Sequence, residues 1–185
     1  MSEPTDITML LTAHREGDAE AFDELLQRVY PELKTIARRL SGPKDQTLDA
    51  TSLINELYFR LVADRDRKLN DRVHFFALAA RAMRQIAVDY ARQKQRKKRG
   101  GDAVMVELDE RDAAIAQEAE TMIALEQAMQ RIEQHNPTLP RVVECRFFGG
   151  LSVSETAQAL DISPRSVERH WREAKDLLRA ELEAG

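Results

Sequence analysis

The sequence has neither the cysteines for a disulfide framework nor an apolar stretch long enough to span a membrane. Its 185 residues include 1 cysteine, so no disulfide can form within the chain. Cys145 lies in an apolar run, which is typical of a small core residue rather than a nucleophile. No stretch approaches the roughly 20 apolar residues of a membrane span, and the acidic N-terminus lacks the basic start and apolar core of a signal peptide. We therefore expect a soluble, cytoplasmic protein.

Motifs for catalysis and metal binding are missing as well. The 4 histidines are scattered, so no Cys/His or paired-His spacing suits a metal ion. No Gly-rich phosphate loop is present among the 7 glycines. We expect neither an enzyme nor a bound cofactor.

Charge is abundant, at 32% of residues, and its distribution matters more than its sum. The net charge is −4, yet residues 81–99 hold 8 basic residues and 1 acidic one, whereas residues 100–135 hold 9 acidic residues and 2 basic ones. A concentrated positive tract can bind a polyanion even in a near-neutral protein. We hypothesise that the acidic block competes for the basic tract when no nucleic acid is present.

The hydrophobic pattern predicts helices and no strands. Gly100-Gly101 and the clustered acids after them predict a linker. We therefore expect an all-α fold with a first lobe over residues 1–99, a flexible linker over 100–117 and a second lobe over 118–185. The expected helices cover about 7–16, 18–40, 49–61, 73–99, 118–134, 141–148 and 153–160, with a last one from residue 164.

The end of the chain has the signature of a helix–turn–helix. Ser152 and Glu155 have capping-box spacing at the start of a short helix. Asp161 begins a three-residue turn, where its short polar side chain tolerates left-handed geometry. Ser163 is an N-cap and Pro164 suits the first position of the next helix. Residues Leu160, Ile162, Val167 and Trp171 are expected to form a small core.

The second of these two helices presents a basic face. At about 100° per residue, Arg165, Arg169 and Arg172 cluster opposite the apolar stripe. Arginine binds guanine edges or phosphates, and Ser166 and Glu168 could add contacts. The alternative is a solvated face on helices that merely pack. Together, the caps, the turn and the arginines favour DNA binding.

A second basic region ends the first lobe, where residues 92–99 contain 6 basic side chains. With Arg81 and Arg84 it fits a surface that follows a phosphate backbone, with Arg92 and Lys94 among its contacts. Cations that complement a helix dipole are the simpler alternative. Phe75, Phe76 and Tyr90 could stack on unpaired bases, although core positions are the more common role of such aromatics.

These two lobes resemble a bacterial RNA polymerase sigma factor of the extracytoplasmic-function (ECF) class. The segment from Asp49 to Tyr58 resembles the polymerase-binding helix of sigma region two. The segment from His74 to Arg92 resembles the promoter-melting part of that region, and the segment from Arg146 to Arg169 resembles region four. The resemblance covers nearly the whole chain.

The resemblance implies a subunit that binds the clamp and flap of core RNA polymerase and directs it to promoter DNA. Region four would place its basic helix in the major groove of the upstream (−35) element. Region two would melt and hold the downstream (−10) element with the loop over residues 64–72 and the helix face carrying Arg81, Arg84 and Gln85. Polymerase contacts would involve Asp49, Thr51, Ser52, Asn55 and Glu56.

Two departures from the family pattern are informative. Many ECF members have Asp-Ala-Glu-Asp where this chain has Asp49-Ala50-Thr51-Ser52, and many have Asn where this chain has Gln85. A phosphate on Thr51 would add about −1.5 to −2 charge where the acids are absent. We hypothesise that a serine/threonine kinase activates the protein at Thr51, ahead of Ser52, as in a subgroup of ECF factors that lacks these acids. Alternatively, Thr51 is a plain helix cap.

Two other functions remain open from the sequence. One is a self-sufficient transcriptional regulator that binds duplex DNA through the helix–turn–helix. The other is a helical adaptor or anti-factor that does not bind DNA. Binding that never depends on salt concentration would favour this alternative, because phosphate contacts depend steeply on salt.

Overall fold

The computed structural model describes residues 4–41, 48–63, 71–100 and 110–184, and this part of the chain is helical throughout with no strand. The expected all-α fold is thus confirmed. The elements are α1 (Pro4–Arg15), α2 (Ala19–Leu40), α3 (Ala50–Ala63), α4 (Arg72–Gly100), α5 (Glu110–His135), α6 (Thr138–Val143), the π-helix η1 (Glu144–Phe148), α7 (Val153–Leu160) and α8 (Pro164–Ala184).

We call α1 to α4 the first lobe, and short-range signals define the ends of these helices. The Asp18 carboxylate caps α2 by accepting hydrogen bonds from the backbone N–H groups of Glu20 and Ala21. Asp71 caps α4 in the same way, through the N–H of His74 at 2.8 Å. Helix α2 continues through Pro31. The buried face of this lobe gathers aliphatic and aromatic side chains, among them Leu25, Leu33, Leu53, Leu57, Phe75 and Met83.

We call α5 to α8 the second lobe, and its helix–turn–helix matches the predicted one closely. Both halves of the capping box are present, since Ser152 accepts from the N–H of Glu155 and Glu155 accepts from the N–H of Ser152. Asp161 ends α7 with a left-handed backbone at φ 53° and ψ 49°. Small apolar residues from α6, α7 and α8 fill the space between the helices: Val142, Ala157 and Val167, with Leu160, Ile162 and Trp171 beside them.

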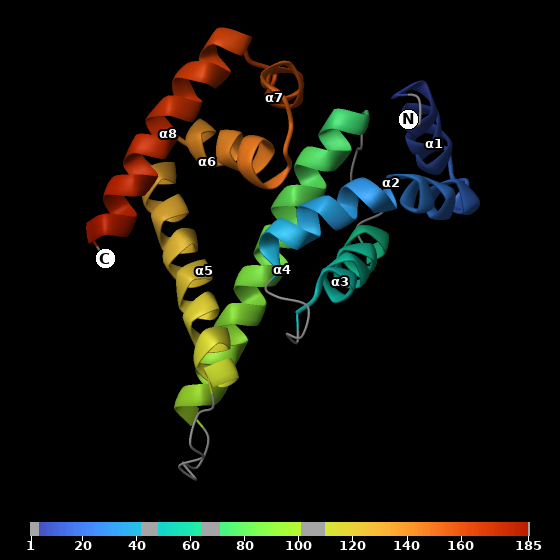
Figure 1. The fold of residues 1–185 in the computed structure, drawn as a ribbon. Coiled ribbons are helices and arrows are strands. Elements are labelled where there is room, and N and C mark those ends of the chain that lie inside the picture. The colour runs from blue at the N-terminus through green and yellow to red at the C-terminus, as the bar shows by residue number, and fades with distance from the viewer. Residues whose placement is uncertain (1–3, 42–47, 64–70, 101–109, 185) are drawn as a thin grey trace.

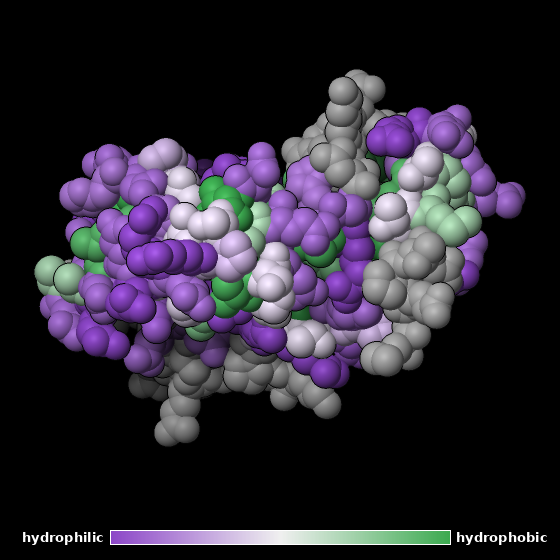
Figure 2. Space-filling model, turned by 90° about the horizontal axis from the view of Figure 1, so that it is seen from above, coloured by the Kyte–Doolittle hydropathy of each residue, from purple (hydrophilic) through white to green (hydrophobic). Residues whose placement is uncertain are grey.

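The two lobes pack against each other around α4, which lies at the centre of the molecule (Figure 1). Helix α5 runs alongside α4, and η1 and α7 also contact it. A single hydrophobic core joins both lobes, so that Phe75 and Met83 of α4 belong to the same cluster as Met129 of α5 and Phe148 of η1. The side viewed in Figure 2 is mostly hydrophilic with small apolar patches, in keeping with a core that lies inside.

Several element boundaries differ from those expected. Helix α1 begins at Pro4 rather than after Asp6, because proline is well suited to the first turn of a helix. Helix α5 begins at Glu110, so residues 110–117 of the expected linker are helical. The expected helix over 141–148 starts earlier, at Thr138, and finishes as the π-helix η1. Residues 64–70 and 101–109, where a loop and the start of the linker were expected, lie outside the described residues.

The turn at Asp161 allows a stability test that uses opposite substitutions. Asp161→Gly should be more stable than Asp161→Ala by about 1 kcal/mol, because alanine resists a positive φ and glycine does not. At Ser154, an exposed position in the first turn of α7, the order should reverse, because glycine has a lower helix propensity than alanine. Urea unfolding of the four variants measures both differences. The same order at both positions would contradict the left-handed turn.

Candidate nucleic-acid interface

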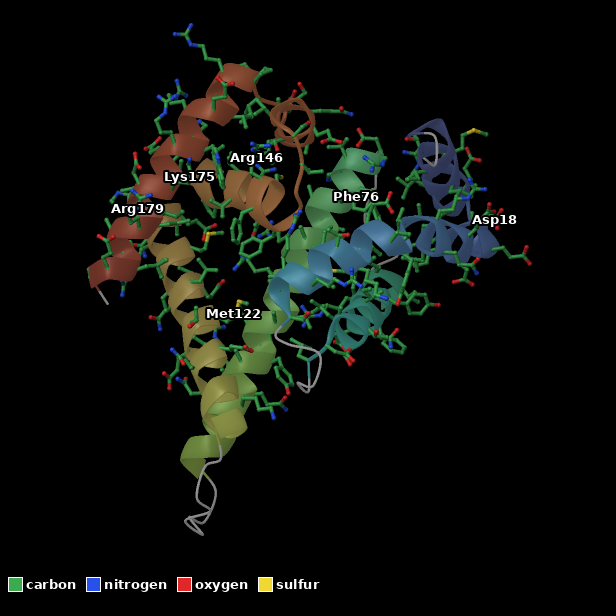
Figure 3. The ribbon with its side chains drawn as sticks, viewed as in Figure 1. Asp18, Phe76, Met122, Arg146, Lys175 and Arg179 are labelled. Atoms are coloured by element: carbon green, nitrogen blue, oxygen red, sulfur yellow. The ribbon has the colours of Figure 1, made fainter. Side chains whose placement is uncertain are left out.

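The basic face of α8 is exposed, as its spacing predicted. The Ser163 hydroxyl caps the helix by accepting from the N–H of Ser166 at 3.1 Å. Val167 and Ala174 are fully buried, which turns the opposite side outward. Arg165, Glu168, Arg169 and Arg172 are exposed on that side, together with the acidic Glu173 and Asp176, and Lys175 and Arg179 add positive charge further along α8 (Figure 3). Four guanidinium groups and an ammonium group are thus presented on one long helix.

Ser166 has a different local role from the arginines. Its hydroxyl lies 2.9 Å from the Ser163 hydroxyl, and the residue is half-buried at the helix start. The side chain therefore belongs to the cap of α8 in this structure.

Contacts around Trp171 fix the orientation of α8. The Arg146 guanidinium lies 5.8 Å from the indole ring centre and the Lys175 ammonium lies 5.4 Å from it, both in cation–π geometry. Arg146 also donates a 2.6 Å hydrogen bond to the carbonyl of Leu151. These contacts tie η1 to the basic helix, so the arginine face has a rigid support.

Helix α4 presents a second set of polar residues. Arg81 and Gln85, one turn apart, are exposed, while Arg92 and Lys94 are half-buried. The Lys94 ammonium lies 5.6 Å from the centre of the Tyr90 ring. Phe75 and Phe76 are buried in the core at 0% and 3% exposure, so they do not offer stacking surfaces for bases here.

Arg84 is placed differently from its neighbours Arg81 and Gln85. It is 7% exposed and lies between α4 and the second lobe. Its guanidinium donates to the carboxylate of Glu126 on α5 and, at 2.7 Å, to that of Glu144 on η1. An arginine expected to contact DNA is thus bound to two carboxylates of the same chain.

The N-terminal half of α3 carries the residues expected to contact polymerase. The Asp49 carboxylate accepts from the N–H of Ser52 at 2.7 Å, and this hydrogen bond holds the pKa of Asp49 below its usual value. Thr51, Ser52, Asn55 and Glu56 are all exposed on one side of the helix. The structure therefore brings these four residues together on an open face.

Phe59 belongs to the same face and was missed by the sequence reasoning. Its side chain is 65% exposed, although it is large and apolar. It follows Asn55 by four residues and falls outside the buried stripe of Leu53, Ile54 and Leu57. An aromatic residue off the apolar stripe is the signal that could have identified it.

A groove between α2 and α3 opens beside this face. Its volume is about 500 Å³, and it is lined by Asp23, Leu26, Gln27, Tyr30, Leu33, Ile54, Asn55 and Tyr58. Two tyrosines, Tyr30 and Tyr58, lie in its lining, and aromatic residues are enriched at surfaces that bind protein partners.

Metal and membrane sites receive no support from the part of the chain that the structure describes. There, no three His, Cys, Asp or Glu side chains gather as a metal site would require. No helix in the described ranges has the length and apolarity needed to cross a bilayer. Burial raises the pKa of the Cys145 thiol to about 12, which agrees with a core residue rather than a nucleophile.

Comparison with known proteins adds one strong match. Residues 4–184 match the family described as "ECF sigma factor", which is nearly the full length of the chain. No curated protein matches the chain.

The arginine face of α8 can be tested with duplex DNA alone. Each phosphate contact contributes about −0.9 to the slope of log K against log salt concentration. Replacing Arg165, Arg169 and Arg172 together by alanine should therefore weaken binding and flatten the slope by about 2 to 3. Arg28→Ala, which removes an arginine paired with Glu24 on α2, is the control and should keep the wild-type slope. An unchanged slope in the triple variant would exclude this face as the phosphate-binding surface.

Proposed function

The chain belongs to the ECF sigma factor family, and from that premise we propose how its parts divide the work of transcription initiation. As a sigma factor it has core RNA polymerase and promoter DNA as partners. The lobe over residues 1–99 binds polymerase and melts the promoter, and the lobe over residues 118–185 recognises the upstream element. Residues 100–117 join the two.

The upstream element is bound by α8 in its major groove. Arg165, Glu168, Arg169 and Arg172 contact bases and phosphates, with Ser166 at the helix end that enters the groove first. The support is the exposed arginine face on a helix held by a capped turn and by Trp171. This face is the observation that carries the proposal.

The downstream element is melted and held by the exposed side of α4. Arg81 and Gln85 contact the separated strand, and Arg92 and Lys94 follow its phosphates. The support is the position of these side chains along one helix and the polar character that they share. Arg84 joins them only after it has left Glu126 and Glu144.

Polymerase is bound by the exposed face of α3, and Thr51 is the regulated position on it. Thr51 is the second residue of α3, where a phosphate meets the positive end of the helix dipole. Its side chain is exposed, so a serine/threonine kinase can reach it. The phosphate supplies negative charge and acceptor oxygens where other family members carry carboxylates, and it thereby completes the contact with basic groups of the polymerase clamp.

Phosphorylation of Thr51 is tested by run-off transcription with purified core polymerase. The protein phosphorylated on Thr51 should initiate from its promoter, whereas the unmodified protein and Thr51→Ala should not. Ser52→Ala should remain active after phosphorylation, because Thr51 is the preferred site. Thr121→Ala removes another exposed threonine, on α5, and serves as the control.

Two outcomes would contradict the phosphorylation step or the whole proposal. Full activity of folded Thr51→Ala, in cells and in the purified system, would exclude the step. Failure of every form to bind core polymerase, together with tight promoter binding by the free protein, would favour a self-sufficient regulator instead.

Phe59 gives a test of the α3 face that does not depend on charge. Phe59→Ser should weaken binding of the phosphorylated protein to core polymerase by about 30-fold, because an aromatic residue at the centre of an interface typically contributes about 2 kcal/mol. Met9→Ser is a matched control, since Met9 is also 65% exposed but lies on α1. Fluorescence anisotropy with labelled protein measures both affinities. Equal affinities for the two variants would place the polymerase contact elsewhere.

A further inference from the structure

Three charged side chains meet at the junction of the two lobes. Arg84 comes from α4, Glu126 from α5 and Glu144 from η1, and the guanidinium donates to both carboxylates. Their side chains are 9%, 13% and 8% exposed. The cluster carries one positive and two negative charges out of water, where each charge depends on its partners.

Among the described residues, the Arg84 guanidinium does not find a partner for every one of its hydrogen-bond donors. Its Nε atom is buried and has no hydrogen-bond partner in the part of the chain that the structure describes. A buried donor without an acceptor costs free energy that a core built only for stability would avoid. The junction thus contains strong charge pairs together with a buried donor, Arg84 Nε, that has no acceptor among the described residues.

Further polar contacts cross between the lobes at other points of the junction. Arg72 lies 3.5 Å from a carboxylate oxygen of Glu155, and the Gln158 amide donates to Asp71 at 3.1 Å. The Arg39 guanidinium donates to the carbonyl of Phe148 at 3.1 Å. All three join the first lobe to the second, so polar contacts that water or another partner can also satisfy supplement the shared hydrophobic core at the junction.

We propose that the Glu126–Arg84–Glu144 cluster is an autoinhibitory clasp, which keeps the lobes together in the free protein and withholds Arg84 from the unpaired promoter strand. This inference rests on the function proposed above. Carboxylates and phosphates offer the guanidinium the same pair of acceptor oxygens. Glu126 and Glu144 therefore bind the guanidinium as the phosphates of a nucleic-acid backbone do. When the clasp is released, phosphates replace the two carboxylates as partners of Arg84.

The clasp acts on the two DNA-binding helices unequally. Arg165, Arg169 and Arg172 of α8 are exposed in the closed arrangement, whereas Arg84 of α4 is covered. The free protein can therefore contact duplex DNA through α8, whereas α4 cannot use Arg84 to hold a separated strand. Strand binding becomes available when the lobes part, as they must when each lobe takes its own site on polymerase and promoter.

The test uses the full chain with Glu126→Gln and Glu144→Gln together. Small-angle X-ray scattering should show a larger radius of gyration for this variant, because the neutral amides no longer hold Arg84 at the junction. Its affinity for a fluorescein-labelled single-stranded oligonucleotide of mixed sequence should rise about tenfold, since a smaller fraction of molecules is closed. The control, Glu120→Gln with Glu133→Gln, makes the same change in net charge at two exposed positions on α5 and should match the wild type in both measurements.

A folded double variant that stays as compact as the wild type, with unchanged strand affinity, would overturn the clasp. Circular dichroism establishes folding. If the double variant does not fold, Glu126→Gln alone decides the matter, since it leaves Glu144 to pair with Arg84, and a smaller change in the same direction is expected. Neither measurement needs polymerase, so failure of the clasp is distinct from failure of run-off transcription, which tests the proposed function.

Discussion

The buried guanidinium of Arg84 is the constraint on which the arrangement of the two lobes depends. A charge at 7% exposure must be matched locally, and Glu126 and Glu144 match it from two elements of the second lobe. Removal of one partner from a buried ion pair typically costs about 3–5 kcal/mol, whereas replacing the whole cluster by apolar residues is often neutral. Such a cluster thus specifies which surfaces meet, and the surrounding apolar contacts of Phe148 and Met129 supply the burial.

Features governed by neighbouring residues could be predicted from the sequence. The capping box at Ser152, the turn at Asp161 and the outward arginines of α8 all depend on interactions within a few positions. For these elements the local pattern and the tertiary structure demand the same conformation, which is why the predictions agree with the structure.

The lobe junction could not be predicted in this way. Arg84 is 42 residues from Glu126 and 60 residues from Glu144, and nothing in the local pattern distinguishes it from Arg81. The hypothesis that the acidic block competes for the basic tract stays a prediction, and it names neither Glu126 nor Glu144 as a partner of Arg84. Phe59 was missed for a related reason, since its exposure depends on how α3 packs. Helix α5 was expected to start later because the composition of residues 110–117 is typical of a linker, yet these residues are helical.

Helix α8 has a mechanical consequence for the whole molecule. Its 21 residues extend for about 30 Å as one rigid rod. Near one end it carries the arginine face, and near the other Glu181 forms an ion pair with Arg131 of α5, the helix that also contributes Glu126. Because a rigid rod moves as one body, a tilt at the end that carries the arginine face also displaces the end that is paired with α5, and α5 is one of the two elements that cover Arg84.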